Sequence, residues 1–72
     1  MTAEQHTQWQ ELLGTKAVSS WTGIPEETLR YFRHRNEGPA SFKLGRRVVY
    51  ARGDVEAWIA ARRSATLSGD AA

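Results

Sequence analysis

The segments TLRYFRHR, at residues 28–35, and FKLGRRVVY, at residues 42–50, decide the fold of this chain. The first is rich in arginine and has helical spacing. The second alternates apolar and polar residues around Gly45, which predicts a basic β-hairpin. A helix fits the major groove of duplex DNA, and a basic hairpin suits the phosphate backbone beside it. The pair indicates two cationic elements that could contact one duplex.

Positive charge is concentrated in the middle of the chain, although the formal net charge is only +2. Seven basic residues and one acid fall between Thr28 and Arg52, which gives this part +6 and leaves the remainder at −4. A cationic region between acidic ends is the electrostatic pattern of a protein that binds a polyanion. The plainer alternative is a solvated surface with scattered arginines.

Length and composition restrict the class of protein. The 72 residues suffice for one domain with a small core, and no cysteine is present to form a disulfide or a thiolate metal site. No apolar run is long enough to span a membrane, and the polar start TAEQHTQ is unlike a signal peptide. We therefore expect a cytoplasmic protein.

A first helix is expected from Thr15, a suitable N-cap, to Gly23, which suits the left-handed position after a helix. Its inward face would carry Ala17, Val18 and Trp21. Gly23 begins a tight turn, and Pro25 then opens a second helix because its missing N–H would be unpaired there. Two short helices joined by such a turn describe a helix-turn-helix.

The second helix has two different sides. At about 100° per residue, its apolar side carries Leu29, Phe32 and Asn36. Its exposed side carries Glu27, Arg30, Tyr31 and His34. Glu26 and Glu27 lie in the first turn, where the helix dipole favours negative charge.

The hairpin admits two registers around Gly45. A two-residue loop would place Arg47 opposite Leu44 on the core face. A three-residue loop, residues 45–47, keeps the four apolar side chains on one face by pairing Leu44 with Val48 and Phe42 with Tyr50. We therefore predict the longer loop, with Arg46 and Arg47 both at its tip.

A last helix is expected from Arg52 or Gly53 to Arg63, with Trp58 on its apolar face. The order of elements predicts an α+β fold, a small winged helix-turn-helix with a two-stranded wing and a C-terminal helix. We assign this domain to residues 11–63 and expect flexible segments at residues 1–10 and 64–72. Within the first of these, Trp9 could form a helical turn with Leu12 and Leu13.

Three motifs carry a resemblance to a known family: TKAV at residues 15–18, TLRYFR at residues 28–33, and the run at residues 38–58 that contains KLGRRVVYAR and DVEAW. They resemble the excisionases, or recombination directionality factors, which are DNA-binding proteins related to the MerR superfamily. The resemblance covers about residues 12–63. Members of this family direct the recombination of phages and mobile elements, or activate prophage genes.

The resemblance implies that the second helix enters the major groove and that the wing lies on the backbone or in the adjacent minor groove. It assigns DNA contacts in the recognition helix to Thr28, Arg30, Tyr31 and His34. It assigns DNA contacts in the wing to Lys43, Arg46 and Arg47. Arg30 suits guanine recognition through its planar guanidinium, and its alternatives are a phosphate contact or an ion pair with Glu26. Arg33 points nearer the apolar side, so we expect it to be a flanking or a structural residue.

Two features depart from the family pattern. Pro25 stands where relatives carry a serine cap, and such a loss typically costs about 1 kcal/mol, partly offset by the fixed φ of proline. No long dimerisation helix follows Trp58, so we do not expect the effector sensing of MerR-like regulators.

No arrangement of residues predicts catalysis. Glu26 and Glu27 are adjacent on a helix, so their carboxylates diverge and do not flank one substrate atom. His6 and His34 lie in unrelated contexts, and no spacing of acids completes a metal site around either. We therefore expect no enzyme activity, no metal, no cofactor and no small-molecule substrate.

We predict a sequence-specific DNA-binding excisionase that bends attachment-site DNA and directs integrase-mediated excision of a phage or mobile element. Its partners would be double-stranded DNA, an integrase and further copies of itself bound cooperatively, with no membrane. Its location would be the nucleoid of a bacterial host cell. The alternatives are a small phage or prophage transcription regulator with the same fold and a protein-interaction adaptor whose basic wing meets an acidic partner.

Overall fold

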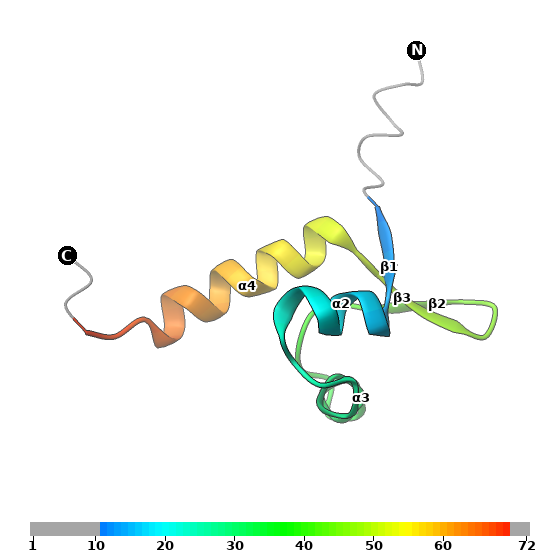
Figure 1. Cartoon of the computed structure of the whole chain (residues 1–72), viewed down its shortest axis with the longest axis horizontal. Helices are drawn as coiled ribbons and strands as arrows, with labels where there is room; N and C mark the ends of the chain where they lie inside the picture. Colours follow the sequence, from blue (N-terminus) through cyan, green and yellow to red (C-terminus); the bar gives the residue numbers. More distant parts are fainter. Residues whose placement is uncertain (1–10, 70–72) are drawn as a thin grey trace, which may run out of the picture.

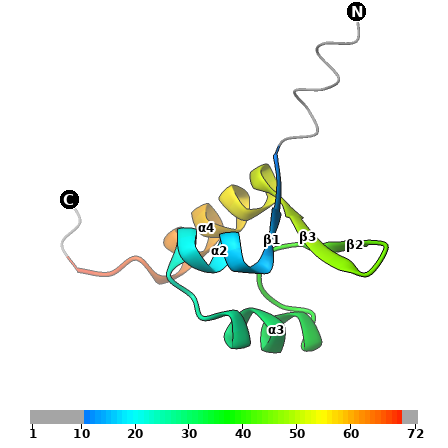
Figure 2. The same cartoon turned by 45° about the vertical axis from the view of Figure 1, so that its right-hand side comes forward.

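The structure, a computed structural model, describes residues 11–69 (Figure 1). Its elements in chain order are β1 (Leu12–Gly14), α2 (Thr15–Thr22), α3 (Glu26–His34), β2 (Phe42–Leu44), β3 (Arg47–Ala51) and α4 (Arg52–Thr66). The strands form one antiparallel sheet in the order β1-β3-β2. The predicted α+β winged helix-turn-helix is confirmed, with β2 and β3 as the wing (Figure 2). The predicted flexibility of residues 1–10 and the helical turn at Trp9 lie outside the described residues.

Strand β1 is the element that sequence reasoning missed. Leu12 and Leu13 pair with Ala51 and Tyr50 of β3, so the predicted helical turn is wrong at these two positions. The backbone N–H of Arg52 also donates to the carbonyl of Glu11 at 2.8 Å, which extends the pairing by one step. Because β1 adds to one edge and β2 to the other, β3 is the central strand.

The hairpin has a two-residue loop, so the predicted three-residue loop is wrong. Leu44 pairs with Arg47, Lys43 with Val48, and Phe42 with Val49. Gly45 is the first loop residue and has a φ of +62°, which a type II′ turn requires at that position. As a result, Arg46 lies in the loop and Arg47 begins β3.

This register divides the apolar residues of the wing between two faces. Opposite pairs share a face and neighbours alternate, so Phe42 and Leu44 lie on the face away from Val48. They remain 39% and 49% exposed. The prediction failed because it assumed a hairpin with one buried face. In the central strand β3, the consecutive residues Val49 and Tyr50 are both buried.

The core is a cluster of fully buried side chains that joins three helices and the sheet. It consists of Val18 from α2, Leu29 from α3, Tyr50 from β3 and Val55 from α4. Leu13, Ile24, Val48 and Ile59 pack against this cluster. Each helix and the central strand therefore contribute one residue to the centre, as expected for a domain with a small core.

Trp21 and Trp58 lie outside the buried cluster. Trp21, predicted to face inward, is 38% exposed, and the guanidinium of Arg52 lies 4.8 Å above its ring. Trp58 is partly buried, and its ring lies 6.3 Å from that of Phe32. Of the predicted inward face of α2, only Val18 is buried.

The turn between α2 and α3 is closed by local hydrogen bonds. Gly23 adopts the predicted left-handed conformation, with a φ of +81°, and its N–H donates to the carbonyl of Ser19 at 2.8 Å. The hydroxyl of Thr22 donates to the carbonyl of Val18 at 2.8 Å and accepts the N–H of Ile24 at 3.2 Å. These bonds fix the direction in which α3 leaves the turn.

Both helix starts differ from the predicted ones by one residue at most. Gly14, rather than Thr15, is the N-cap of α2, and Pro25 is the N-cap of α3. Neither residue supplies a side-chain cap. Glu26 and Glu27 lie in the first turn of α3, as predicted, where they complement its dipole.

Helix α4 starts at Arg52, as predicted, and ends at Thr66 rather than at Arg63. Its final turns are exposed on every side, and Figure 1 shows them extending away from the sheet. The described residues contain no helix of the length and apolar character that a membrane crossing needs.

Gly38, in the loop after α3, has a φ of +80°, and a Cβ atom there would lie 2.9 Å from Cβ of Phe32. We expect Gly38→Ala to lower the free energy of unfolding by more than the roughly 1–2 kcal/mol of a left-handed backbone alone. Urea denaturation measures the loss. Gly23→Ala is the matched control, because its φ is +81° and a Cβ atom added there would have no neighbour within 4 Å. Equal losses in the two variants would contradict the close packing of Phe32 on Gly38.

Candidate nucleic-acid interface

Helix α3 presents one exposed side and one buried side. Arg30, Tyr31 and His34 point away from the core, and Tyr31 is 55% exposed. Leu29 is fully buried on the opposite side, and Phe32 is partly buried next to it. The predicted separation of an apolar and a basic side is thus confirmed for these residues.

Within the described part of the chain, Arg30 has one weak ion-pair partner. Its Nη1 atom lies 4.0 Å from Oε1 of Glu26, one turn earlier, and both side chains are about half exposed. Exposed pairs with this spacing contribute only about 0.3–0.5 kcal/mol. The guanidinium can therefore exchange Glu26 for a stronger acceptor at little cost.

The structure does not bring Thr28 together with Arg30. Thr28 lines a hollow between α3 and α4, together with Phe32 and Trp58. Arg30 lines a different hollow on the other flank of the helix. A DNA contact by Thr28 would come from the edge of the exposed side. Asn36, predicted on the apolar side, is exposed and follows the helix with a φ of +60°.

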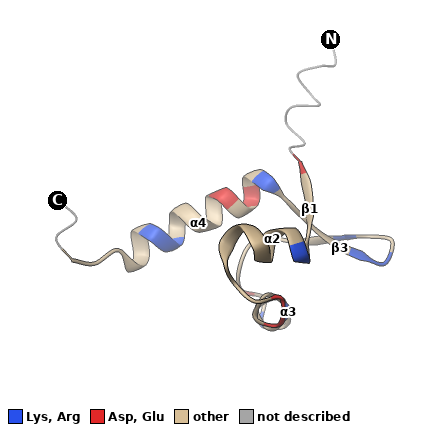
Figure 3. Cartoon of the chain, viewed as in Figure 1, with Lys and Arg blue, Asp and Glu red and all other residues tan. Residues whose placement is uncertain are grey.

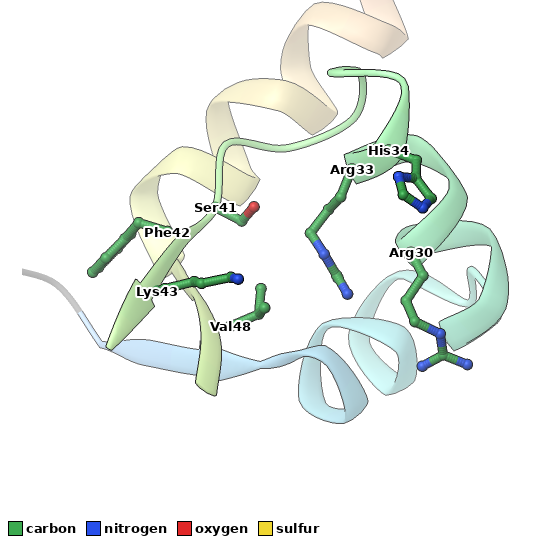
Figure 4. Close-up of a pocket in the computed structure, with 7 residues that line it drawn as sticks. All are labelled: Arg30, Arg33, His34, Ser41, Phe42, Lys43 and Val48. Atoms are coloured by element: carbon green, nitrogen blue, oxygen red, sulfur yellow. The ribbon is translucent and has the colours of Figure 1, made fainter. Parts of the chain in front are cut away.

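The hollow beside Arg30 lies between α3 and the hairpin, and we call it the helix–hairpin hollow (Figure 4). Its lining residues are Arg30, Arg33, His34, Ser41, Phe42, Lys43 and Val48. Figure 4 shows the side chain of Lys43 directed into the hollow from β2, toward Arg33 of α3. No acidic side chain from residues 11–69 lines this hollow. The hollow therefore joins α3 and the hairpin into one cationic surface.

Arg33 ties α3 to the rest of the fold. Its Nη1 donates to the hydroxyl of Tyr50 at 2.6 Å and to Oγ1 of Thr15 at 3.3 Å. These bonds satisfy the phenol of a tyrosine whose side chain is fully buried. The structural role predicted for Arg33 is confirmed. Its position in the hollow was not foreseen, because helical spacing says nothing about the hairpin opposite.

The wing arginines separate. Arg46 is exposed in the two-residue loop, at the tip where it was predicted. Arg47 is not at the tip: it begins β3 on the face opposite Lys43, and its Nη2 would lie 3.7 Å from a Cβ added at Gly14. Lys43 lines the hollow beside α3 and Arg46 lies in the loop of the hairpin, whereas a DNA contact shared between α3 and Arg47 would require the Arg47 side chain to reorient.

Basic residues occur on several elements. Figure 3 shows basic segments on the hairpin, at the start of α2 and at two places in α4, and acidic segments near the starts of α3 and α4. Arginine, lysine and tyrosine side chains are the usual donors to phosphate oxygens, and arginine also reads guanine edges. Among residues 11–69, no group of three or more His, Cys, Asp or Glu side chains could hold a metal ion.

Comparison with known proteins agrees with this geometry. A family model described as a helix-turn-helix domain matches residues 12–63, which extend from β1 into α4. No curated protein and no solved structure matches the chain. In this motif the second helix enters the major groove of DNA and reads base edges. Since the match covers most of its length, the chain belongs to the helix-turn-helix domain family, a family of DNA-binding modules.

Proposed function

We propose that this protein is an excisionase, a DNA-binding factor that bends attachment-site DNA and directs an integrase toward excision of a phage or mobile element. The proposal is supported by the resemblance of the motifs at residues 15–18, 28–33 and 38–58 to that family. It is also supported by the helix-turn-helix family model over residues 12–63.

One observation carries the DNA-binding part of the proposal. Arg30 and His34 of α3 and Lys43 of the wing line a single hollow, and none of the acidic side chains that the structure describes lines it. When α3 lies in the major groove, its exposed side faces base edges, and the cations of the hollow and the hairpin tip face the adjacent phosphates. A duplex can thus contact both elements at once.

The small size of the module explains the need for partners. A single module typically buries on the order of 600–1,000 Å² of protein surface on DNA. With few phosphate contacts, its binding is modest and falls steeply with salt. Neighbouring copies along the duplex and an integrase bound beside them would raise occupancy and hold a bend. The protein would then act without catalysis or a cofactor, by arranging DNA for the recombinase.

Fluorescence anisotropy on an attachment-site duplex tests DNA binding. For about three to five neutralised phosphates, we expect a plot of log K against log salt to have a slope of about −3 to −5. Lys43→Ala should make the slope less negative by about 1. Arg63→Ala, which removes the same charge from the exposed end of α4, is the matched control and should leave the slope unchanged. A folded protein that binds no duplex at low salt would refute the proposal.

The recombination role needs its own measurement. We expect footprints of adjacent direct repeats at an attachment site, and stimulation of excision when the protein is added to the cognate integrase. Protection of a single promoter site, with no effect on excision, would assign the protein to transcription control instead.

A further inference from the structure

The helix–hairpin hollow contains two cations that face each other without a counter-ion. Figure 4 shows the guanidinium of Arg33 and the ammonium group of Lys43 directed into the same space from opposite walls. Lys43 comes from the hairpin and Arg33 from α3. The hydroxyl of Ser41 lies beside them at the rim of the hollow.

Neither of these cations is neutralised within the described part of the chain. Three arginines have carboxylate partners: Arg30 with Glu26, Arg35 with Glu37, and Arg52 with both Glu11 and Glu56. Arg46, Arg47, Arg62 and Arg63 have no such partner among the described residues, but none of them lines the hollow. Within residues 11–69, no carboxylate oxygen lies within 4.0 Å of Arg33 or Lys43. Like charges that share a partly buried space repel each other, and a bound anion removes that repulsion.

Arg33 is held in position and still has donors to offer. The bonds to Tyr50 and Thr15 both use Nη1. A guanidinium has five N–H donors in a fixed plane, so those on Nη2 and Nε remain for a ligand. Because Tyr50 is buried in β3 and Thr15 begins α2, the two bonds set the orientation of this plane.

We propose that the helix–hairpin hollow seats one phosphate group of the DNA backbone, bound by Arg33 and Lys43, with the hydroxyl of Ser41 as an additional donor. The proposal rests on the DNA-binding function and names a contact within it. A tetrahedral anion with several acceptor oxygens matches donors that converge from two walls. Since Arg33 is also bonded to β3 and α2, a phosphate seated here fixes how α3 lies in the major groove. It therefore sets the register of the protein on the duplex.

The test is a scan of the bound duplex with single methylphosphonate substitutions, each of which removes one backbone charge. We expect one position at which the wild-type protein loses affinity by about tenfold, as for loss of a charge-assisted hydrogen bond. In Lys43→Ala, the methylphosphonate at this position should hardly change the affinity, because the contact with that phosphate has already been lost. Arg46→Ala, which removes a wing cation outside the hollow, is the matched control and should keep the tenfold sensitivity there.

Lys43 is exposed, so Lys43→Ala is expected to remain folded, which circular dichroism verifies. If the protein binds DNA but no phosphate position depends on Lys43, the phosphate seat is refuted and the DNA-binding function stands. If no duplex binds, the proposed function itself fails. A titration with inorganic phosphate, followed by the backbone amide signals of Ser41 and Lys43, tests whether the hollow binds a free anion instead of a phosphate of DNA. Saturable shifts without any sensitive duplex position would assign the hollow to a free anion and overturn the DNA assignment.

Discussion

Leu29→Ala is expected to unfold a large share of the protein at room temperature. Leu29 is fully buried in the cluster that joins the three helices to the sheet. Truncation of such a leucine costs about 2–5 kcal/mol, through lost burial and the cavity left behind. A domain of this size rarely draws more than about 3–5 kcal/mol from a single core. The loss is thus comparable to the whole stability, and urea or thermal denaturation followed by circular dichroism measures it.

Tyr31→Ala is the matched control for this prediction, because it removes a large side chain from the same helix at a position that is 55% exposed. Its loss should be limited to two contacts of the Tyr31 ring. The guanidinium of Arg35, 5.5 Å from the ring centroid, is worth about 0.5–1 kcal/mol at an exposed site, and the tilted ring of Phe32, 6.4 Å away between centroids, is worth about 0.5–1.5 kcal/mol. If the two variants denature at the same point, Leu29 does not anchor α3 in the way the structure indicates.

The helices could be predicted from the sequence because their signals are local. Gly23 stops α2, Pro25 precedes α3, and the apolar spacing identifies Val18 and Leu29 as core residues. Each of these signals acts within a few residues of the feature it determines. The small core adds few competing demands, so local preference and tertiary packing agree.

The sheet could be predicted only in part, because strand pairing depends on remote residues. Nothing near Leu13 reveals that its partner is Tyr50. Without β1, the hairpin looked like a ribbon with one buried face, and that assumption selected the wrong register. Strand β1 pairs with the edge of β3 that β2 leaves open, and both faces of this central strand contain buried residues. The positive φ of Gly45 allows the two-residue turn.

In the candidate interface, too, the features set by local spacing could be predicted and those set by remote packing could not. Helical spacing predicts the exposed side of α3, and Arg30, Tyr31 and His34 do lie away from the core. Lys43 and Arg33 face each other across the hollow because of the way the hairpin packs beside α3. No local sequence pattern determines that packing. The register also determines the position of Arg47, which was predicted at the hairpin tip but pairs with Leu44 on the face of the hairpin opposite Lys43.

Arg30→Ala is expected to reduce the preference for the cognate DNA sequence, in addition to lowering affinity. A bidentate contact from arginine to guanine supplies about 1–3 kcal/mol of discrimination against the wrong base, or about 5- to 150-fold. Arg30 is suited to this contact because it is exposed near the middle of α3 and, among residues 11–69, is engaged only by a 4.0 Å pair with Glu26. Competition binding with cognate duplexes and single-base variants measures the change. The Arg30→Ala variant should bind duplexes that differ at one guanine position with similar affinity, whatever base stands there.

Lys43→Ala provides the contrast that identifies the role of Arg30. A phosphate contact has no sequence information, so its removal should weaken binding to cognate and variant duplexes by the same factor and reduce the salt dependence. Arg30→Ala should instead compress the ratio of cognate to variant affinity, because the energy it removes is specific to one base pair. If Arg30→Ala weakened all duplexes equally, Arg30 would be a second phosphate contact. Sequence recognition would then have to come from its neighbours on the same side of α3, Tyr31 and His34.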